Sequence, residues 1–279
     1  MKRILLPTDF SENSLKAIQY ALLIYKDIKC TFYLVHTFTP PVYETEYLYG
    51  SSIQFELGDI LRKSSEEQME ELRAQLEDQY SNPNHTFIGR IAFNTLLDEI
   101  SQTVEAENID LIVMGTQGAT NAAEILIGTN TIHVIKRAHC PVIAIPQKFE
   151  LKTPKEILFP NDYEMRFKKE SFTQLSQIAD LHGARINVLH VRAGYELTGE
   201  QEKNKSQLKG LLGDLCLFHE VPDNSIIPAI NEFLGKGKID LLVMVRNKHT
   251  FLERLFIEPV IKRIGFHVTV PFMVLPYSN

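Results

Sequence analysis

The chain has 279 residues, of which 44% are hydrophobic and 23% charged, with a formal net charge of −6 and a pI near 5.9. This composition indicates a folded protein of one large or two medium-sized domains, and the acidic balance argues against a nucleic-acid partner, because phosphate backbones are bound by basic surfaces. No run of apolar residues is long enough for a membrane span or a signal-peptide core, so we expect no membrane association and a location in the cytoplasm.

Short aliphatic runs alternate with amphipathic stretches along the first half of the chain. Strands are predicted near 3–7, 30–37, 86–91, 109–115 and 141–146. Leu15, Ile18 and Leu22 recur at helical spacing after Ser11, a suitable N-cap, and residues 60–80 form a second, strongly charged amphipathic helix. This alternation is typical of βαβ units with a parallel sheet, and therefore of an α/β fold.

The second half of the chain repeats the first. The segment KRILLPTDF at 2–10 matches KEILFPNDY at 155–163, and IDLIVM at 109–114 matches IDLLVM at 239–244. The offset falls from 154 at the two histidines of the second strand to 130 at the later strands, so the second copy lacks 24 residues in between. We expect a duplicated domain. Its two copies are predicted at 1–147 and 154–279, with second-copy strands near 156–160, 185–191, 215–220, 239–245 and 271–275.

The fourth predicted strand leads directly into a glycine-rich stretch, MGTQGATNAAEILIGTNTIHVIKR, at 114–137. If the strand order is 3-2-1-4-5, the first and fourth strands flank the crevice of a doubly wound sheet, and Asp9 faces Gly115 there. A carboxylate can accept hydrogen bonds from ribose hydroxyls or an adenine amino group, and glycine lets a phosphate approach the backbone. A helix that begins near Thr129 would aim its unpaired amides at the same crevice.

The residues alone leave two interpretations of this stretch open. In the first, the glycines and the helix start hold a phosphate, and Thr129 and Thr131 add hydroxyl donors. In the second, the glycines only turn the chain, and Thr129 or Asn130 only caps a helix. Isolated glycine patterns are too common to decide between them.

Three stretches of the first copy together resemble the universal stress protein family: ILLPTDFSENSLKAIQYAL at 4–22, YLVHTF at 33–38, and 109–146. Within the last, the pattern Gly, two residues, Gly, nine residues, Gly-Thr marks the ATP-binding branch of that family. The resemblance covers the first copy almost throughout and the second more faintly. It implies two tandem Rossmann-like domains of the HUP type, each a five-stranded parallel sheet of order 3-2-1-4-5 flanked by helices.

The same resemblance implies that the first copy binds ATP, with or without Mg²⁺, or another adenine nucleotide. Pro7 and Asp9 match the strand end that contacts adenosine, and Thr37 matches a position whose backbone touches adenine. The loop over the ribose and phosphates and the phosphate cradle are matched by Met114, Gly115, Gln117, Gly118, Gly128, Thr129, Asn130 and Thr131. Gln117 replaces a frequent histidine and Ala119 a frequent basic residue, so phosphate binding should be weaker.

The second copy differs at the positions that matter most for a phosphate. At the offset of 130, Gly128 and Thr129 become Glu258 and Pro259. Glu258 would put a carboxylate where the phosphate sits, and Pro259 removes an amide donor while still suiting the first turn of a helix. We therefore expect the second copy to keep the fold without the site.

The leading hypothesis is a stress-response or signalling protein that binds an adenine nucleotide. Hydrolysis should be slow at most, because Asp9 is the one carboxylate among the matched site residues. An adenine-nucleotide hydrolase remains an alternative, as does an interaction module that uses the tyrosine-rich segment 39–55. That segment could also be a packing flap or a lid over the site.

Several other residues are expected to serve packing. His36 and His190 end buried strands and are predicted to be core histidines with satisfied hydrogen bonds. The three cysteines show no Cys-x-x-Cys spacing, and we expect reduced thiols without a metal.

The last strands of the two copies, VIAIP at 142–146 and FMVLP at 272–276, are exposed edges if each copy stands alone. Members of the family often dimerise by pairing these edges, so we expect the two copies to form a pseudo-dimer within one chain. The sequence leaves open whether the chain also forms a homodimer, and it identifies no protein partner.

Overall fold

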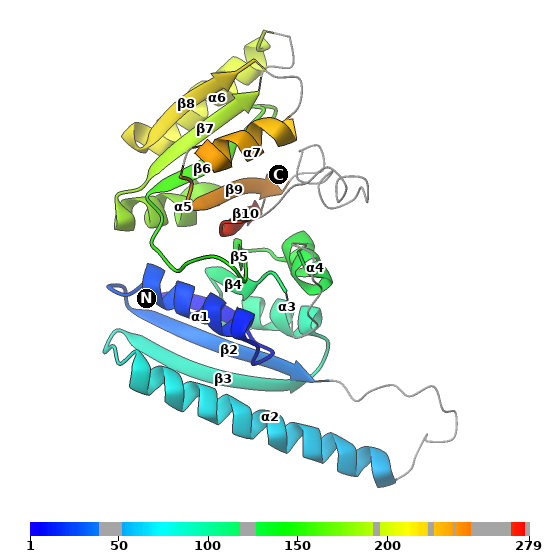
Figure 1. Ribbon diagram of the computed structural model, residues 1–279. Helices are drawn as coiled ribbons and strands as arrows, with labels where there is room; N and C mark the ends of the chain where they lie inside the picture. The colour runs from blue at the N-terminus through cyan, green and yellow to red at the C-terminus, as the bar shows by residue number, and fades with distance from the viewer. Residues whose placement is uncertain are drawn as a thin grey trace.

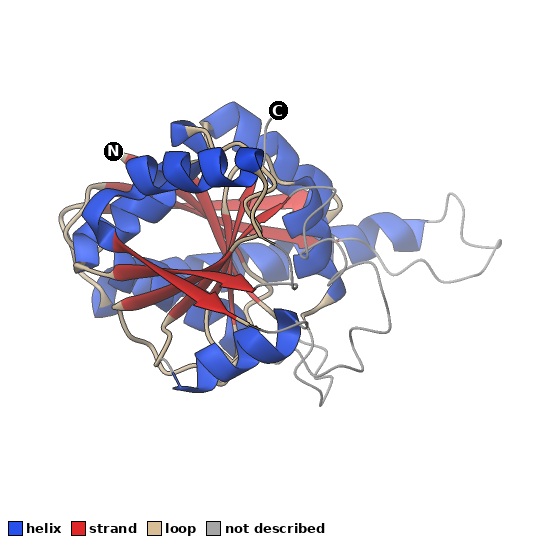
Figure 2. Cartoon of the chain, turned by 90° about the horizontal axis from the view of Figure 1, so that it is seen from above, coloured by secondary structure: helices blue, strands red, loops and turns tan. Residues whose placement is uncertain are grey.

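The computed structural model describes residues 1–38, 52–117, 127–191, 196–222, 226–236, 238–246 and 269–276. It is an α/β fold in which helices cover both faces of one twisted sheet (Figures 1 and 2). Several predictions fall outside the described residues: Gly118, Ala119, Glu258, Pro259 and most of the segment 39–55.

The first half of the chain forms five strands in the order β3-β2-β1-β4-β5, all parallel to their neighbours. The elements in chain order are β1 (Lys2–Pro7), α1 (Glu12–Ile24), β2 (Cys30–Phe38), α2 (Ser52–Gln79), β3 (His85–Phe93), α3 (Leu96–Glu107), β4 (Leu111–Gly115), α4 (Thr129–Arg137) and β5 (Val142–Ile145). This arrangement confirms the predicted strand order 3-2-1-4-5.

The second half repeats that order as β8-β7-β6-β9-β10, again with parallel neighbours. Its elements are β6 (Glu156–Pro160), α5 (Lys169–His182), β7 (Arg185–Val191), α6 (Gly199–Leu212), the 3₁₀ turn η1 (Gly213–Leu215), β8 (Cys216–Val221), α7 (Ile226–Lys236), β9 (Leu241–Arg246) and β10 (Phe272–Pro276). The predicted fold class, two tandem Rossmann-like units of five parallel strands, is confirmed.

Capping side chains set several of the helix boundaries. Ser11 accepts a hydrogen bond from the amide of Ser14 at the start of α1, as predicted, and Thr95 does the same at the start of α3. Thr198 forms a full capping box at the start of α6. Gly183 ends α5 in the left-handed conformation with φ of 56°, which glycine adopts without steric cost.

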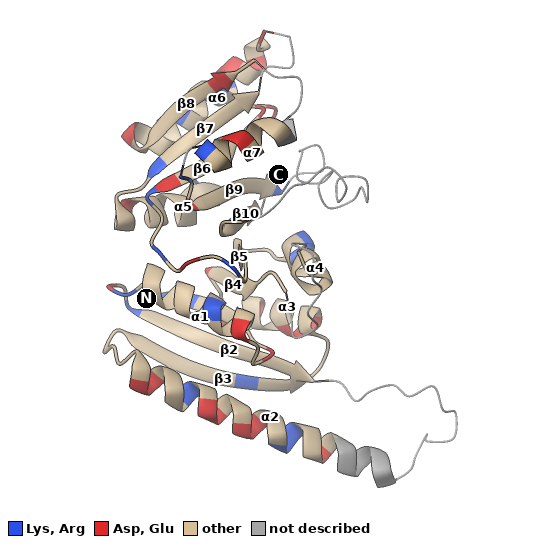
Figure 3. Cartoon of the chain, viewed as in Figure 1, with Lys and Arg blue, Asp and Glu red and all other residues tan. Residues whose placement is uncertain are grey.

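The long helix α2 lies along β3 at one end of the sheet and carries most of the charge in that region (Figure 3). Its exposed ion pairs include Arg62 with Glu66 at 2.8 Å and Arg73 with Glu70 at 2.6 Å. Such pairs on an exposed helix contribute little to stability and mark a solvated face. Within the described part of the chain, no helix is both long and apolar enough to span a membrane.

The two halves meet through one antiparallel strand pair. Phe272, Met273 and Val274 of β10 lie opposite Ala144, Ile143 and Val142 of β5, which makes a single ten-stranded sheet. The apolar core on each face of that sheet contains residues from both halves. The halves therefore share their cores.

Candidate functional site

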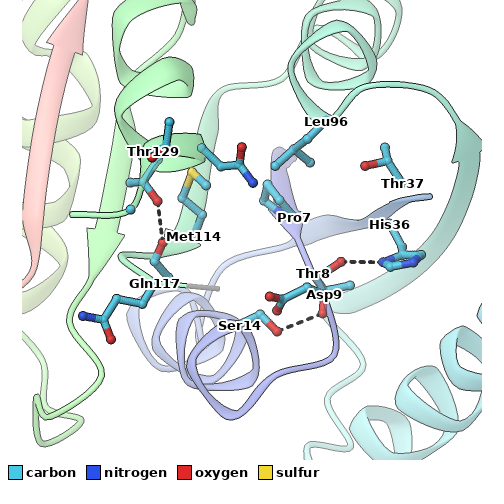
Figure 4. Close-up of a pocket in the computed structure, with 14 residues that line it drawn as sticks. Pro7, Thr8, Asp9, Ser14, His36, Thr37, Leu96, Met114, Gln117 and Thr129 are labelled. Atoms are coloured by element: carbon cyan, nitrogen blue, oxygen red, sulfur yellow. Dashed lines mark hydrogen bonds between the residues drawn. The ribbon is translucent and has the colours of Figure 1, made fainter. Parts of the chain in front are cut away.

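A pocket opens where β1 and β4 stop pairing. Their hydrogen-bonded register covers Ile4 with Leu111 and Leu5 with Ile112, and Pro7 beyond it has no amide to continue the ladder. The strands therefore part at their carboxyl ends, as doubly wound sheets do at the point where strand order reverses. The cavity there has a volume of about 310 Å³ (Figure 4).

The pocket brings together ten of the eleven predicted site residues, and Gly118 is outside the described residues. Those ten are Pro7, Asp9, Thr37, Met114, Gly115, Gln117, Gly128, Thr129, Asn130 and Thr131. Four more residues complete the lining: Thr8, Ser14, His36 and Leu96. Thr8, Ser14 and Leu96 were not predicted from the sequence to line the site, and His36 was predicted to be a packing residue.

A network of short-range hydrogen bonds fixes the turn after β1. The hydroxyls of Thr8 and Ser14 lie 3.0 Å apart, and the amide of Phe10 donates to Thr8 Oγ1 at 3.0 Å. Asp9 Oδ1 accepts hydrogen bonds from the hydroxyl of Ser11 at 2.5 Å and from its amide at 3.2 Å. The exposed carboxylate of Asp9 is thereby held at the rim of the pocket.

His36 fastens the same turn from the neighbouring strand β2. Its Nδ1 lies 2.9 Å from the carbonyl oxygen of Thr8, and its ring lies 4.5 Å from that of Phe10. The second half repeats the arrangement, with Nδ1 of His190 2.9 Å from the carbonyl oxygen of Asn161. Both histidines have backbone partners, which favours the interpretation that they serve packing.

The glycine at the end of β4 makes room for α1. A Cβ atom at Gly115 would lie only 2.5 Å from Nδ2 of Asn13, which donates to the carbonyl of Gln117 at 2.9 Å. The carbonyl of Gly115 accepts a hydrogen bond from the buried hydroxyl of Thr131 at 2.9 Å. The missing side chain therefore lets Asn13 hold the backbone at the pocket wall.

Gly128 allows an equally close contact at the start of α4. Its amide donates to the carbonyl of Thr116 at 2.6 Å, and a Cβ atom would lie 2.9 Å from that oxygen. Gly128 is the N-cap, so the alternative in which Thr129 or Asn130 caps the helix is wrong. No described side chain caps α4, and the amides of Thr129, Asn130 and Thr131 have no acceptor within the helix.

The charge in the pocket comes from few groups. None of the fourteen described lining residues is Lys or Arg, and Asp9 is the one carboxylate among them. The start of α4 supplies a partial positive charge, equivalent to roughly half an elementary charge. Thr131 is only 3% exposed and already donates to Gly115, so of the two predicted hydroxyl donors only the exposed Thr129 faces solvent.

The described residues include potential metal ligands and three free cysteines. No group of three or more His, Cys, Asp or Glu side chains is placed there to hold a metal ion. Burial raises the pKa of Cys30 and Cys140 to about 12, so both remain protonated thiols at neutral pH.

The corresponding turn of the second half is tied to a helix. Gln201 Nε2 donates to the carbonyl of Asp162 at 3.0 Å, and Asn204 Nδ2 donates to that of Tyr163 at 2.9 Å. Both donors come from α6. Thus α6 holds the turn after β6 in place.

A doubled Rossmann-like sheet with a pocket at the switch point of its first half defines the architecture of this α/β protein. Residues 1–146 match the family model described as the Universal stress protein family, and the chain belongs to that family.

Two universal stress proteins of Methanocaldococcus jannaschii match about half of this chain. MJ0531 is 30% identical over 145 residues, which are 52% of this chain and 81% of MJ0531. MJ0577 is 28% identical in an alignment of 160 residues that covers 53% of this chain and 96% of MJ0577. A universal stress protein from Archaeoglobus fulgidus has the same fold over 99% of this chain and 97% of its own, with a TM-score of 0.65 and 16% identity.

Proposed function

We propose that the first half binds ATP or a related adenine nucleotide in the pocket between β1 and β4, and that the protein has a cytoplasmic stress-response or signalling role. One observation carries this proposal. Asp9 borders the pocket on one side, and the amide end of α4, which no described side chain caps, borders it on the other. These are acceptors for a nucleoside and donors for a phosphate, placed in one cavity.

The two sides of the pocket suggest the orientation of the nucleotide. The adenosine would lie against Pro7, Asp9 and Thr37, at the ends of β1 and β2. The phosphates would point at the amides of Thr129 and Asn130, where the helix dipole favours an anion. Met114, Gly115, Gln117, Gly118, Gly128 and Thr131 would complete the site through their backbone.

Binding is better supported than turnover. Asp9 is the only carboxylate among the described lining residues, so any Mg²⁺ would be held mainly by the phosphates and water. Without a second carboxylate among the described lining residues to position the attacking water, hydrolysis of ATP would be slow at most.

The proposal includes one site in each chain. Residues 1–147 and 154–279 would act as two domains paired through β5 and β10, a pseudo-dimer in which only the first domain binds nucleotide. In the second domain, Glu258 and Pro259 replace the residues that would hold the phosphate.

The variant Thr129→Glu tests the phosphate end of the site. Thr129 is exposed in the first turn of α4, so a glutamate there should stabilise the helix slightly, by about 0.3–1 kcal/mol. The same carboxylate should repel the phosphates and weaken ATP binding by about tenfold or more. Calorimetric titration with ATP and thermal unfolding measure the two effects, which have opposite signs.

Thr129→Gln is the matched control, because it adds a side chain of the same size without the charge. It should bind ATP within about threefold of the wild type. ATP binding by Thr129→Glu as tight as that of the wild type would rule out a phosphate at α4. Gly128→Glu is a poorer test, because its side chain would also collide with the carbonyl of Thr116.

A further inference from the structure

Helix α4 connects the pocket of the first half to the second half. Its first residues line the pocket, and its last turn lies beside the junction of β5 and β10 (Figure 1). Because β5 and β10 are antiparallel, the carboxyl ends of the second half's strands lie near the amino ends of the first half's strands, where α4 terminates. The two ends of one short helix thus meet two different halves.

A cation from the second half binds the carboxyl end of this helix. Arg246, the last residue of β9, donates from Nη1 to the carbonyl oxygen of Ile135 at 2.9 Å. Ile135 is in the last turn of α4, where backbone carbonyls lack donors within the helix. The last backbone hydrogen bond of the helix runs from the amide of Ala138 to the carbonyl of Val134. A guanidinium at this position satisfies the carbonyl and complements the helix dipole.

The hydrogen bond between Arg246 and Ile135 lies beside an apolar cluster to which both halves contribute side chains. Val134, Ile135 and Ala138 belong to the same apolar core as Met244 of β9 and Phe272 of β10. The last turn of α4 is therefore packed together with side chains of the second half, and the hydrogen bond from Arg246 adds a directional constraint to that packing.

Arg246 and Thr116 occupy equivalent positions in the two copies, at the offset of 130 and just at the end of the fourth strand. Thr116 holds the beginning of α4, because its carbonyl accepts the amide of Gly128 at 2.6 Å. Arg246 holds the end of the same helix. Equivalent strand ends thus fix the two ends of one nine-residue helix, which is too short to be stable by itself.

We propose that Arg246 is a positioning residue for the nucleotide site: it fixes α4 from the second half and so directs the first amides of the helix at the phosphates. This inference rests on the proposed function. It gives the second half a role in ligand binding without a ligand of its own.

Titrations of the full-length chain with ATP and with adenosine test this role. Arg246→Ala should weaken ATP binding by about fivefold or more, the size expected for a contact that acts through an intervening element. Adenosine binding should stay within about twofold of the wild type, because the amides of α4 face only the phosphates. Arg246→Lys keeps the charge and should retain more ATP affinity than Arg246→Gln.

Arg185→Gln is the matched control in the second half. Arg185 of β7 pairs with Glu156 of β6. Because β6 and β9 separate β7 from β10, both ligands should bind this variant normally. The role of Arg246 is overturned if Arg246→Ala binds ATP like the wild type, or if ATP and adenosine weaken equally. If Arg246→Ala does not fold, equal ATP affinities for the Lys and Gln variants overturn it. A wild-type protein that binds neither ligand refutes the proposed function itself.

Discussion

The hydroxyl of Thr131 is committed to the protein backbone. It is buried and donates to the carbonyl of Gly115, which ties the first turn of α4 to the end of β4. Thr131→Val keeps the shape of the side chain but leaves that carbonyl unsatisfied, so we expect a loss of about 1–3 kcal/mol of unfolding free energy. Chemical denaturation measures the loss, and an unchanged midpoint would show that the bond is not needed.

At the level of single residues, most of the pocket could be predicted from the sequence. Asp9 and Gly115 follow neighbouring strands, so the strand order alone places them together. Thr8 and Ser14 were missed because their hydroxyls meet only after the turn folds back through Phe10, whose φ is 61°. The role of Gly115 was also unforeseen, since the space it leaves is filled by Asn13 and not by a ligand.

Among the helices, α4 was easier to predict than α2. Helix α4 begins at Thr129, near which its start was predicted, whereas α2 begins at Ser52, eight residues before the predicted position. The helix continues through Gly58 and Asp59. A single glycine costs about 1 kcal/mol relative to alanine, which a helix of 28 residues can absorb.

The end of α5 carries a histidine whose charge opposes folding. Burial lowers the pKa of His182, whose Nε2 lies 3.0 Å from the carbonyl oxygen of Ile24 in the other half. The neutral ring is therefore favoured in the folded state. Its stabilising contribution is complete above the unfolded pKa of about 6.5 and is lost as the pH falls through the lower, folded pKa.

This predicts a pH dependence that one substitution should reduce. Between pH 7 and pH 5, the unfolding free energy of the wild-type protein should decrease by about 1 kcal/mol at most, because the ring of His182 is partly exposed. His182→Gln should show a shallower slope over the same range. Burial also lowers the pKa of His219. His219 should therefore preserve part of the pH dependence of the unfolding free energy in the His182→Gln variant. Parallel slopes for the two proteins would exclude His182 as a source of the effect.

On the scale of the whole molecule, the shared sheet should make the two halves unfold together. The antiparallel pair β5–β10 joins the halves, and each of the two apolar cores contains residues from both. We expect one thermal transition with equal calorimetric and van't Hoff enthalpies, although chains of this length often unfold domain by domain. Two separate transitions in scanning calorimetry would contradict this expectation.

The arrangement of the halves was only partly visible in the sequence. The repeat extends to the second half the strand order that the family resemblance implies for the first, and the edges at 142–146 and 272–276 identify the strands that need a partner. The antiparallel register and contacts such as Arg246 with Ile135, 111 residues apart, depend on side chains that meet only in the folded chain. Local patterns cannot supply them.

The number of adenine nucleotides that one chain binds tests the proposed function most directly. Calorimetric titration of the wild-type protein with ATP, ADP, AMP and adenosine, with and without Mg²⁺, gives this stoichiometry directly. We predict saturable binding of one adenine nucleotide per chain. The absence of binding for all four ligands would contradict the proposed function, and two nucleotides per chain would contradict its restriction to the first half.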